Sequence, residues 1–166
     1  MATISKVIIV CGGELSNDIA EQIMSKKPPS LSSMESSIRK MSERPKTLVS
    51  DYDSSTLLCF VVQTVENAAP AEDAGSCVRF FKRKTHPSGL CKDRFCFTVF
   101  GVGDSNLLLD RQTTTAKDCN QVAQELDSRL QTLGAVRHYP LGLADERTGL
   151  TEVDGWIESF WSNLEN

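Results

Sequence analysis

Three short, uninterrupted apolar runs constrain this chain more than any other feature of its sequence. They cover residues 7–10, 57–62 and 95–100, and they are rich in β-branched and aromatic side chains. Continuous runs of this kind are typical of strands buried on both faces, because a strand with one solvated face alternates apolar and polar residues instead. The runs therefore predict a central sheet covered by helices on both sides.

Segments with the helical spacing of apolar residues lie between and after these runs. They begin at Leu15, at Val122 and at Val153, and each repeats apolar side chains every three or four residues. Strands that alternate with helices favour parallel pairing through right-handed crossovers. We therefore predict an α/β sandwich on a parallel sheet, and the chain length favours one domain over residues 1–166.

Two further strands are marked less sharply. Residues 135–141 follow Gly134, which is typical of a glycine that ends a helix, and they predict a strand. A second strand lies either at residues 46–50 or near residues 31–34, while the Ser- and Lys-rich residues 25–44 read as a loop and a short helix. A strand at 46–50 leaves a connection to residue 57 that is shorter than the roughly 10 residues of a usual crossover. Both positions stay open at this point.

Charge, cysteine usage and hydropathy exclude several classes of function. Lys and Arg number 18 against 22 Asp and Glu, so the net charge of −4 offers no basic field to nucleic acid. No apolar run approaches the roughly 18–20 residues that span a bilayer, and no signal-peptide pattern is present, so we expect a cytoplasmic protein without membrane contact. The six cysteines form no CxxC pair, and His86 and His138 lack any surrounding motif, so we expect no metal site and no histidine triad.

Ligands of open α/β sheets bind beyond the carboxyl ends of the strands. After the first run, Gly12 and Gly13 precede a predicted helix, whose N-terminal N–H groups suit an anion. Cys11 stands in the same place, a setting that lowers the pKa of a thiol. After the third run, residues 101–106 read GVGDSN, in which two glycines allow close approach of a flat ligand.

Several longer stretches resemble the FMN domain of the diflavin reductases. They are residues 97–106 (FTVFGVGDSN), 126–135 (LDSRLQTLGA) and 139–145 (YPLGLAD), followed by an aromatic segment at residues 156–161. Residues 79–91 and 153–161 look most like the NADPH-dependent diflavin oxidoreductases, with methionine synthase reductase close behind. The resemblance implies a flavodoxin-like fold, a three-layer α/β/α sandwich on a five-stranded parallel sheet of order 2-1-3-4-5.

The same resemblance implies which residues contact FMN. It places Val102, Gly103 and Asp104 beside the isoalloxazine ring, Asn120 near its rim and Asp145 at the far edge of the site. The remaining cofactor-binding candidates lie in the three loops, and they are Gly12, Gly13, Ser16, Thr64, Asn67, Gly101 and Leu107.

The chain departs from the family pattern in all three loops. Where the family has a hydroxyl-rich Ser/Thr-x-Thr-Gly-Thr-Ala, residues 11–16 read CGGELS, and Glu14 brings a carboxylate that fills the anion site or repels a phosphate. Residues 64–73 lack both glycines of the second loop. Leu107 stands where the family has a flavin-stacking Tyr, and residues 110–115 belong to an insertion.

Two hypotheses follow from these observations. The first is an FMN-binding electron-transfer protein that lacks its own NADPH/FAD reductase domain, so that a redox partner protein must supply or accept its electrons. The second is a degenerate flavodoxin-like module that has lost FMN and serves as a protein-interaction domain. A basic cluster at residues 82–84 with Lys92 and Arg94 fits either an acidic partner or an ordinary charged helix end.

Overall fold

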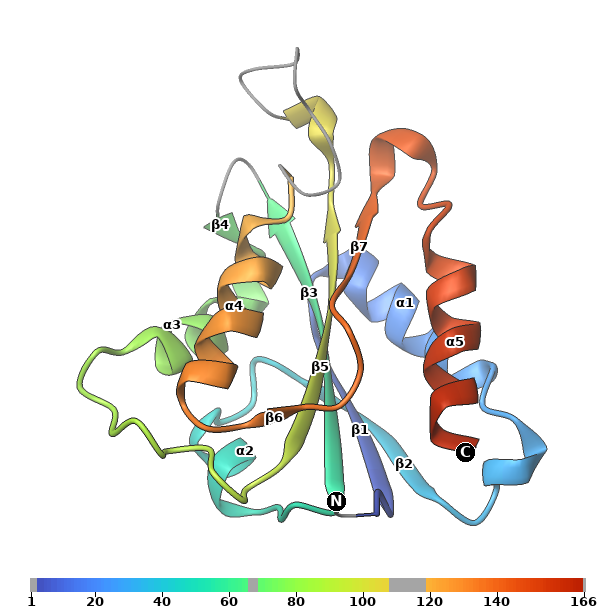
Figure 1. Ribbon diagram of the computed structural model, residues 1–166. Coiled ribbons are helices and arrows are strands. Elements are labelled where there is room, and N and C mark those ends of the chain that lie inside the picture. The colour runs from blue at the N-terminus through green and yellow to red at the C-terminus, as the bar shows by residue number, and fades with distance from the viewer. Residues whose placement is uncertain (1–2, 66–68, 108–118, 166) are drawn as a thin grey trace.

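The computed structural model describes residues 3–65, 69–107 and 119–165 (Figure 1). The strands are β1 (Lys6–Gly12), β2 (Glu35–Lys40), β3 (Thr56–Val65), β4 (Ala69–Pro70), β5 (Cys96–Gly103), β6 (Val136–Arg137) and β7 (Gly142–Asp145). The helices are α1 (Glu14–Ser25), α2 (Lys46–Ser50), α3 (Gly75–Lys82), α4 (Gln121–Thr132) and α5 (Val153–Glu165). Short 3-10 turns follow several strands and helices, namely η1 (Pro29–Leu31), η2 (Glu72–Ala74), η3 (Ser105–Leu107) and η4 (Glu146–Thr148).

The strands form one sheet in the order β2-β1-β3-β5-β6, and these neighbours all pair in parallel. This order confirms the predicted flavodoxin-like α/β fold. The sheet has seven strands rather than five, because β4 pairs antiparallel with the end of β3 and because β6 and β7 share the fifth position beside β5.

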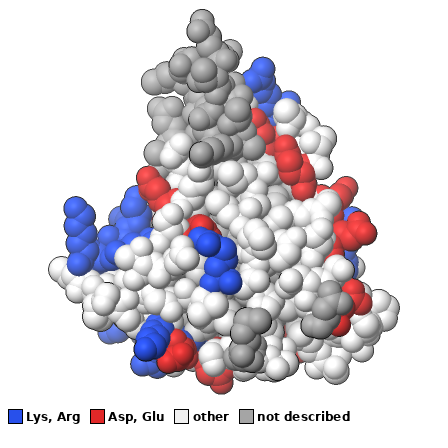
Figure 2. Space-filling model, viewed as in Figure 1, with Lys and Arg blue, Asp and Glu red and all other residues white. Residues whose placement is uncertain are grey.

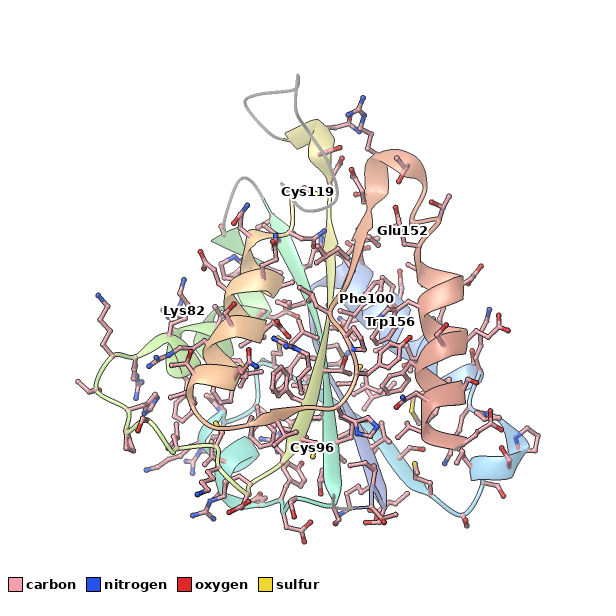
Figure 3. All side chains as sticks on the ribbon, in the orientation of Figure 1. Lys82, Cys96, Phe100, Cys119, Glu152 and Trp156 are labelled. Carbon is pink, nitrogen blue, oxygen red and sulfur yellow. The ribbon has the colours of Figure 1, made fainter. Side chains whose placement is uncertain are left out.

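Helices cover both faces of the sheet, with α1 and α5 on one side and α2, α3 and α4 on the other (Figure 1). Alternate residues of each buried strand enter opposite cores, so that Ile9 packs on the α1/α5 side and Val10 on the other. Phe100 and Trp156 meet on the α1/α5 side, with ring centroids 4.6 Å apart (Figure 3). The predicted strands at residues 7–10, 57–62 and 95–100 and the three predicted helices are confirmed.

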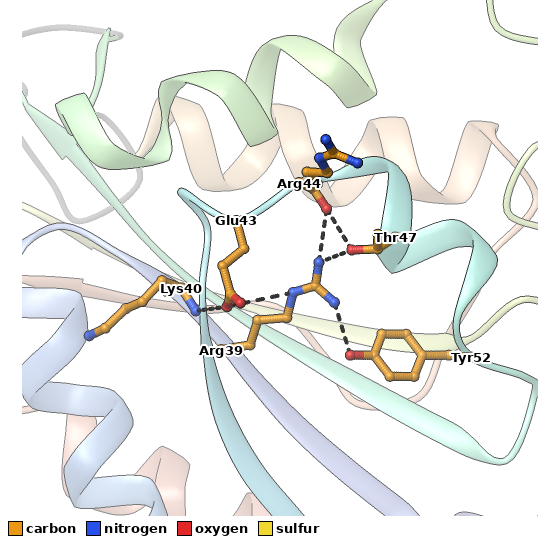
Figure 4. A network of polar contacts seen from close by, with 6 residues as sticks. All are labelled: Arg39, Lys40, Glu43, Arg44, Thr47 and Tyr52. Atoms are coloured by element: carbon orange, nitrogen blue, oxygen red, sulfur yellow. Dashed lines mark hydrogen bonds and ion pairs between the residues drawn. The ribbon is translucent and has the colours of Figure 1, made fainter.

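The second strand lies at neither predicted position. Glu35–Lys40 forms β2, next to the expected 31–34 region, and Lys46–Ser50 is the helix α2. Ile38 is the one apolar residue in β2, which pairs with β1 along a sheet edge, so backbone hydrogen bonds rather than apolar side chains stabilise the strand. Arg39 fixes the start of α2, because its guanidinium donates to the Thr47 hydroxyl and to the Arg44 carbonyl (Figure 4).

The strand predicted at residues 135–141 is also corrected. It pairs only over Val136–Arg137, breaks, and resumes as β7 at Gly142. Pro140 lies in the break, where its missing N–H removes a ladder bond. The Thr98 hydroxyl donates to the Tyr139 carbonyl at 2.8 Å. This side chain therefore satisfies a backbone acceptor that lies in the break between β6 and β7.

Candidate functional site

The carboxyl ends of β1, β3, β5 and β7 meet at one edge of the sheet, where the fold predicts a ligand site. The structure brings most of the predicted residues to this edge. Asn67 lies outside the described residues, as does the insertion at 110–115, and Leu107 ends η3 without a described side chain. The predicted residues that are described lie in three loops, which differ in what they contact.

The two glycines of the first loop are packed against the protein itself. A Cβ atom on Gly12 would stand 2.7 Å from the Ala74 Cβ, and one on Gly13 would stand 2.6 Å from the Gln63 Oε1. Gly13 also has a φ of 110°, which disfavours any other residue. Both glycines are therefore required by close contact with β3 and with the segment around η2.

Two hydrogen-bonding groups of the first loop, the Leu15 N–H and the Ser16 hydroxyl, are used within the chain. The backbone N–H of Leu15, in the first turn of α1, donates to the Gln63 Oε1 at 3.2 Å. The fully buried Ser16 hydroxyl donates back to the Gly12 and Gly13 carbonyls. An amide oxygen of the protein thus accepts from one N–H group of the helix N-terminus that suits an anion, and the exposed Glu14 adds a carboxylate to the same turn.

Cys11 differs from its expected chemistry. It is fully buried, and burial raises the pKa of its thiol, with Lys40 opposing this in part. The expectation of a lowered pKa was wrong because desolvation outweighs the helix N-terminus. Cys11 is a core residue.

Thr64 of the second loop stabilises a helix. Its hydroxyl accepts a hydrogen bond from the Val122 N–H at 3.2 Å, in the first turn of α4. Asn120, the residue at the N-cap of α4, makes no capping bond with its own side chain. Thr64 therefore caps α4 from the neighbouring strand, and it is 4% exposed.

The glycines of the third loop make room for the start of α4. A Cβ atom on Gly101 would lie 2.4 Å from the Ala123 Cβ, and one on Gly103 would lie 2.2 Å from the Cys119 carbonyl oxygen. Figure 3 shows Cys119 beside the end of β5. Val102 is fully buried in the α1/α5 core, so its side chain points away from any ligand at the sheet edge.

Polar residues near the third loop hold neighbouring segments together. The Asn120 amide donates to the Ala144 carbonyl at 3.0 Å, which ties α4 to β7. The half-buried Asp104 accepts from the Asn106 N–H at 2.9 Å, which closes a turn at the end of β5. Of the predicted ring contacts, Asp104 is the one whose side chain stays partly accessible.

Asp145 connects two of the loops. Its Oδ1 accepts from the backbone N–H groups of Ser105 and Arg147, each at 3.0 Å, so it caps η4 and fixes η3. Burial alone would raise the pKa of the Asp145 carboxyl, but hydrogen bonds from Ser105 and Arg147 outweigh it and lower that pKa. The carboxyl is ionised, and it holds the turns η3 and η4 together through these hydrogen bonds.

Gln63 is the residue at this edge that the sequence interpretation missed. Its signal was a single polar side chain after the apolar run 57–62, directly before Thr64. Ala71 and Ala74, which complete the packing on Gly13 and Gly12, carry no motif at all. Among the described residues there is no cluster of three metal-ligating side chains. The same residues include no helix long and apolar enough to cross a membrane.

No family model matches the chain. It is 35% identical to methionine synthase reductase of Bos taurus over 109 residues, which are 65% of the chain and 14% of that protein. It is 33% identical to NADPH-dependent diflavin oxidoreductase 1 of Danio rerio over 111 residues, which are 65% of the chain and 17% of that protein. The chain therefore matches a small part of each curated relative.

Among solved structures, a cysteine-to-alanine mutant of flavodoxin from Pseudomonas aeruginosa superposes with a TM-score of 0.67 at 16% identity. The match covers 97% of this chain and 99% of that one. At this identity the likeness establishes the fold, which agrees with the strand order described above. The chain has a flavodoxin-like fold, and its homologues include the methionine synthase reductases and the NADPH-dependent diflavin oxidoreductases.

Proposed function

We propose that this chain acts in an electron-transfer system, as a flavodoxin-like domain that binds other redox proteins. Its similarity to segments of two kinds of reductase supports the redox context. The fold alone would not, because one fold carries many functions. The role within that system depends on the chemistry of the sheet edge.

The phosphate end of the expected FMN site does not fit a phosphate. The contact that carries this conclusion joins the Leu15 N–H to the Gln63 Oε1. Two further observations support the same conclusion. The Ser16 hydroxyl donates to carbonyls of its own loop, and Glu14 brings a carboxylate to the first turn of α1. We infer that the domain works without FMN anchored in this loop, as a protein-interaction module.

The energetic penalty for a phosphate can be approximated. Displacing the Gln63 side chain gives up one hydrogen bond, worth about 1 kcal/mol. A phosphate near Glu14 meets like charge, which costs about 1 kcal/mol per charge pair at roughly 4 Å in water. A total of about 2–3 kcal/mol corresponds to a loss of roughly 30- to 150-fold in affinity.

An FMN-carrying electron-transfer protein is the second candidate. The shared segment with the diflavin reductases favours it, and so does the gathering of four strand ends at the edge where that cofactor is expected. In that case bound FMN would supply the redox chemistry, and the backbone of Val102–Asp104 would set the surroundings of the ring.

Comparison of FMN with riboflavin separates the two candidates, because the two molecules differ by the phosphate. We expect the purified protein to show no flavin absorbance and to bind FMN no more tightly than riboflavin in fluorescence titrations. Flavin retained through purification, or FMN bound more than about tenfold tighter than riboflavin, would establish a working phosphate site and the second candidate.

A further inference from the structure

One third of the cations of this acidic chain lie in a segment that carries almost no acidic residues. Helix α3 and the loop at residues 83–94 carry six of the 18 Lys and Arg residues and a single acidic residue, Asp93. We call these six residues the α3 patch: Arg79, Lys82, Arg83, Lys84, Lys92 and Arg94. All six are exposed.

The opposite side of the molecule carries the opposite charge. Helices α1 and α5 contain no Lys or Arg and six acidic residues, which are Glu14, Asp18, Glu21, Asp154, Glu158 and Glu165. These helices cover the other face of the sheet from α3 (Figure 1). In Figure 2 blue side chains gather on the side of α3 and red ones on the side of α5, with further blue side chains near the centre and beside η4. The charge of the molecule is therefore distributed unevenly between the two faces of the sheet.

Three contacts hold part of the α3 patch in place. The Arg129 side chain of α4 donates to the Phe81 carbonyl at 2.8 Å and to the Arg83 carbonyl at 2.6 Å, which fixes the end of α3 and the start of the loop. The Arg83 guanidinium lies over the Phe80 ring at 5.5 Å. The cations are therefore presented from a fixed backbone, which reduces the entropy lost when a partner binds.

Most of the patch has no internal counter-ion. Lys82 pairs with Glu125 at 2.8 Å (Lys82 is labelled in Figure 3), whereas the other five cations have no carboxylate within ion-pair distance among the described residues. Internal neutralisation would make the cluster an ordinary charged surface. In the described part of the chain, five of the six cations are not neutralised by a carboxylate, so a positive potential remains available to a partner.

A shallow hollow of about 510 Å³ lies next to these cations, between the end of α3 and α4. Lys82, Lys84, Arg129 and Glu125 line one part of it, and Glu125 is already paired with Lys82. Gln124, Ser128 and Thr132 line the rest, and their spacing of four residues places them in one row along α4. The hollow thus places three cations and one carboxylate, which is paired with Lys82, beside uncharged polar side chains.

We propose that the α3 patch and this hollow bind an acidic segment of a partner protein. Carboxylates of the partner would pair with the cations, and its backbone would face the polar row on α4. A protein segment suits this surface better than a nucleic acid, because the cations are confined to one face and the net charge of −4 disfavours a long polyanion. This inference rests on the proposed docking role, and it names the chemistry of the partner.

Charge-reversal variants of the whole chain test the proposal. Lys84→Glu/Lys92→Glu changes the patch, and Lys26→Glu/Lys40→Glu changes two exposed lysines elsewhere by the same net charge. The probe is a fluorescein-labelled oligoglutamate peptide, followed by anisotropy. We expect salt-sensitive binding that weakens about tenfold or more in the patch variant and less than about twofold in the control variant.

Three results would overturn the proposal. They are absence of oligoglutamate binding at low salt, equal weakening in both variants, and tighter binding of a labelled single-stranded RNA that depends on Lys84 and Lys92. The last result would assign the patch to nucleic acid. The flavin titration tests a different proposal. Tight FMN binding in that titration would refute the flavin-free role of the strand ends, and it would leave the anisotropy result with oligoglutamate unchanged.

Discussion

Substitution of Gly103 by alanine tests whether the third-loop glycines serve the fold. A Cβ atom there would stand 2.2 Å from the Cys119 carbonyl oxygen and 2.8 Å from the Cys119 carbonyl carbon. These are backbone atoms at the entry to α4, and they cannot rotate away as a flexible side chain would. The segment leading into α4 would have to move by about 1 Å to restore ordinary contact.

The expected loss of stability follows from that displacement. Overpacking in a close-packed interior costs about 1–3 kcal/mol, and a clash with backbone belongs near the upper end of this range. For a domain of this size, 1 kcal/mol shifts Tm by about 2–4 °C. We therefore expect Gly103→Ala to lower the free energy of unfolding by about 3 kcal/mol and Tm by about 6–12 °C.

Gly155 supplies the matched control. It lies within α5, and a Cβ atom there would meet no atom within 4 Å. Alanine is favoured over glycine in a helix interior by about 0.5–1 kcal/mol, so Gly155→Ala should raise Tm by about 1–4 °C. Thermal and urea unfolding of wild type and both variants, without any flavin, measure the two effects. An unfolding midpoint of Gly103→Ala equal to that of wild type would refute the packing argument. Ligand binding would then again be the explanation for this glycine.

Three further predictions concern other contacts. Glu14→Thr/Gln63→Ala should strengthen FMN binding relative to riboflavin by roughly tenfold or more, because it removes the carboxylate and the internal acceptor, and an unchanged ratio in titrations would contradict this. Asp145→Asn should lose about 1 kcal/mol of unfolding free energy at pH 7, because neutral acceptors bind N–H groups more weakly. The pKa of Asp145 is lowered in the folded state, so the difference in unfolding free energy between wild type and variant should be present above the unfolded pKa of about 3.9. It should vanish as pH falls through the folded pKa. A difference that stayed constant in urea titrations across that pH range would count against the assignment. Arg39→Met should cost about 1–3 kcal/mol by freeing α2 from β2, and a wild-type urea midpoint would show that the network in Figure 4 adds no stability.

The framework of the fold could be predicted from local patterns. The strands β1, β3 and β5 and the helices α1, α4 and α5 bury enough apolar surface for the pattern to be visible. Their order along the chain predicts the parallel sheet, because few topologies satisfy short right-handed connections. The resemblance in residues 97–145 located the strand ends where a ligand site is expected.

Elements held mainly by partners elsewhere in the fold escaped prediction. In β2, Ile38 is the single apolar residue, and the strand exists because β1 supplies its hydrogen bonds. The helix at Lys46–Ser50 depends on Arg39 from the neighbouring strand. Neither contact is encoded by spacing within the segment that it stabilises.

The candidate site shows the same division. The amino-acid pattern was enough to predict that Gly12, Gly13, Gly101 and Gly103 lie at strand ends and that Glu14 brings a carboxylate to the first loop. The atoms that those glycines contact are visible only in the folded chain. A glycine that admits a ligand and a glycine that admits a neighbouring segment look alike in sequence, because both need the space of a missing Cβ, and only the packed chain shows which atoms fill that space.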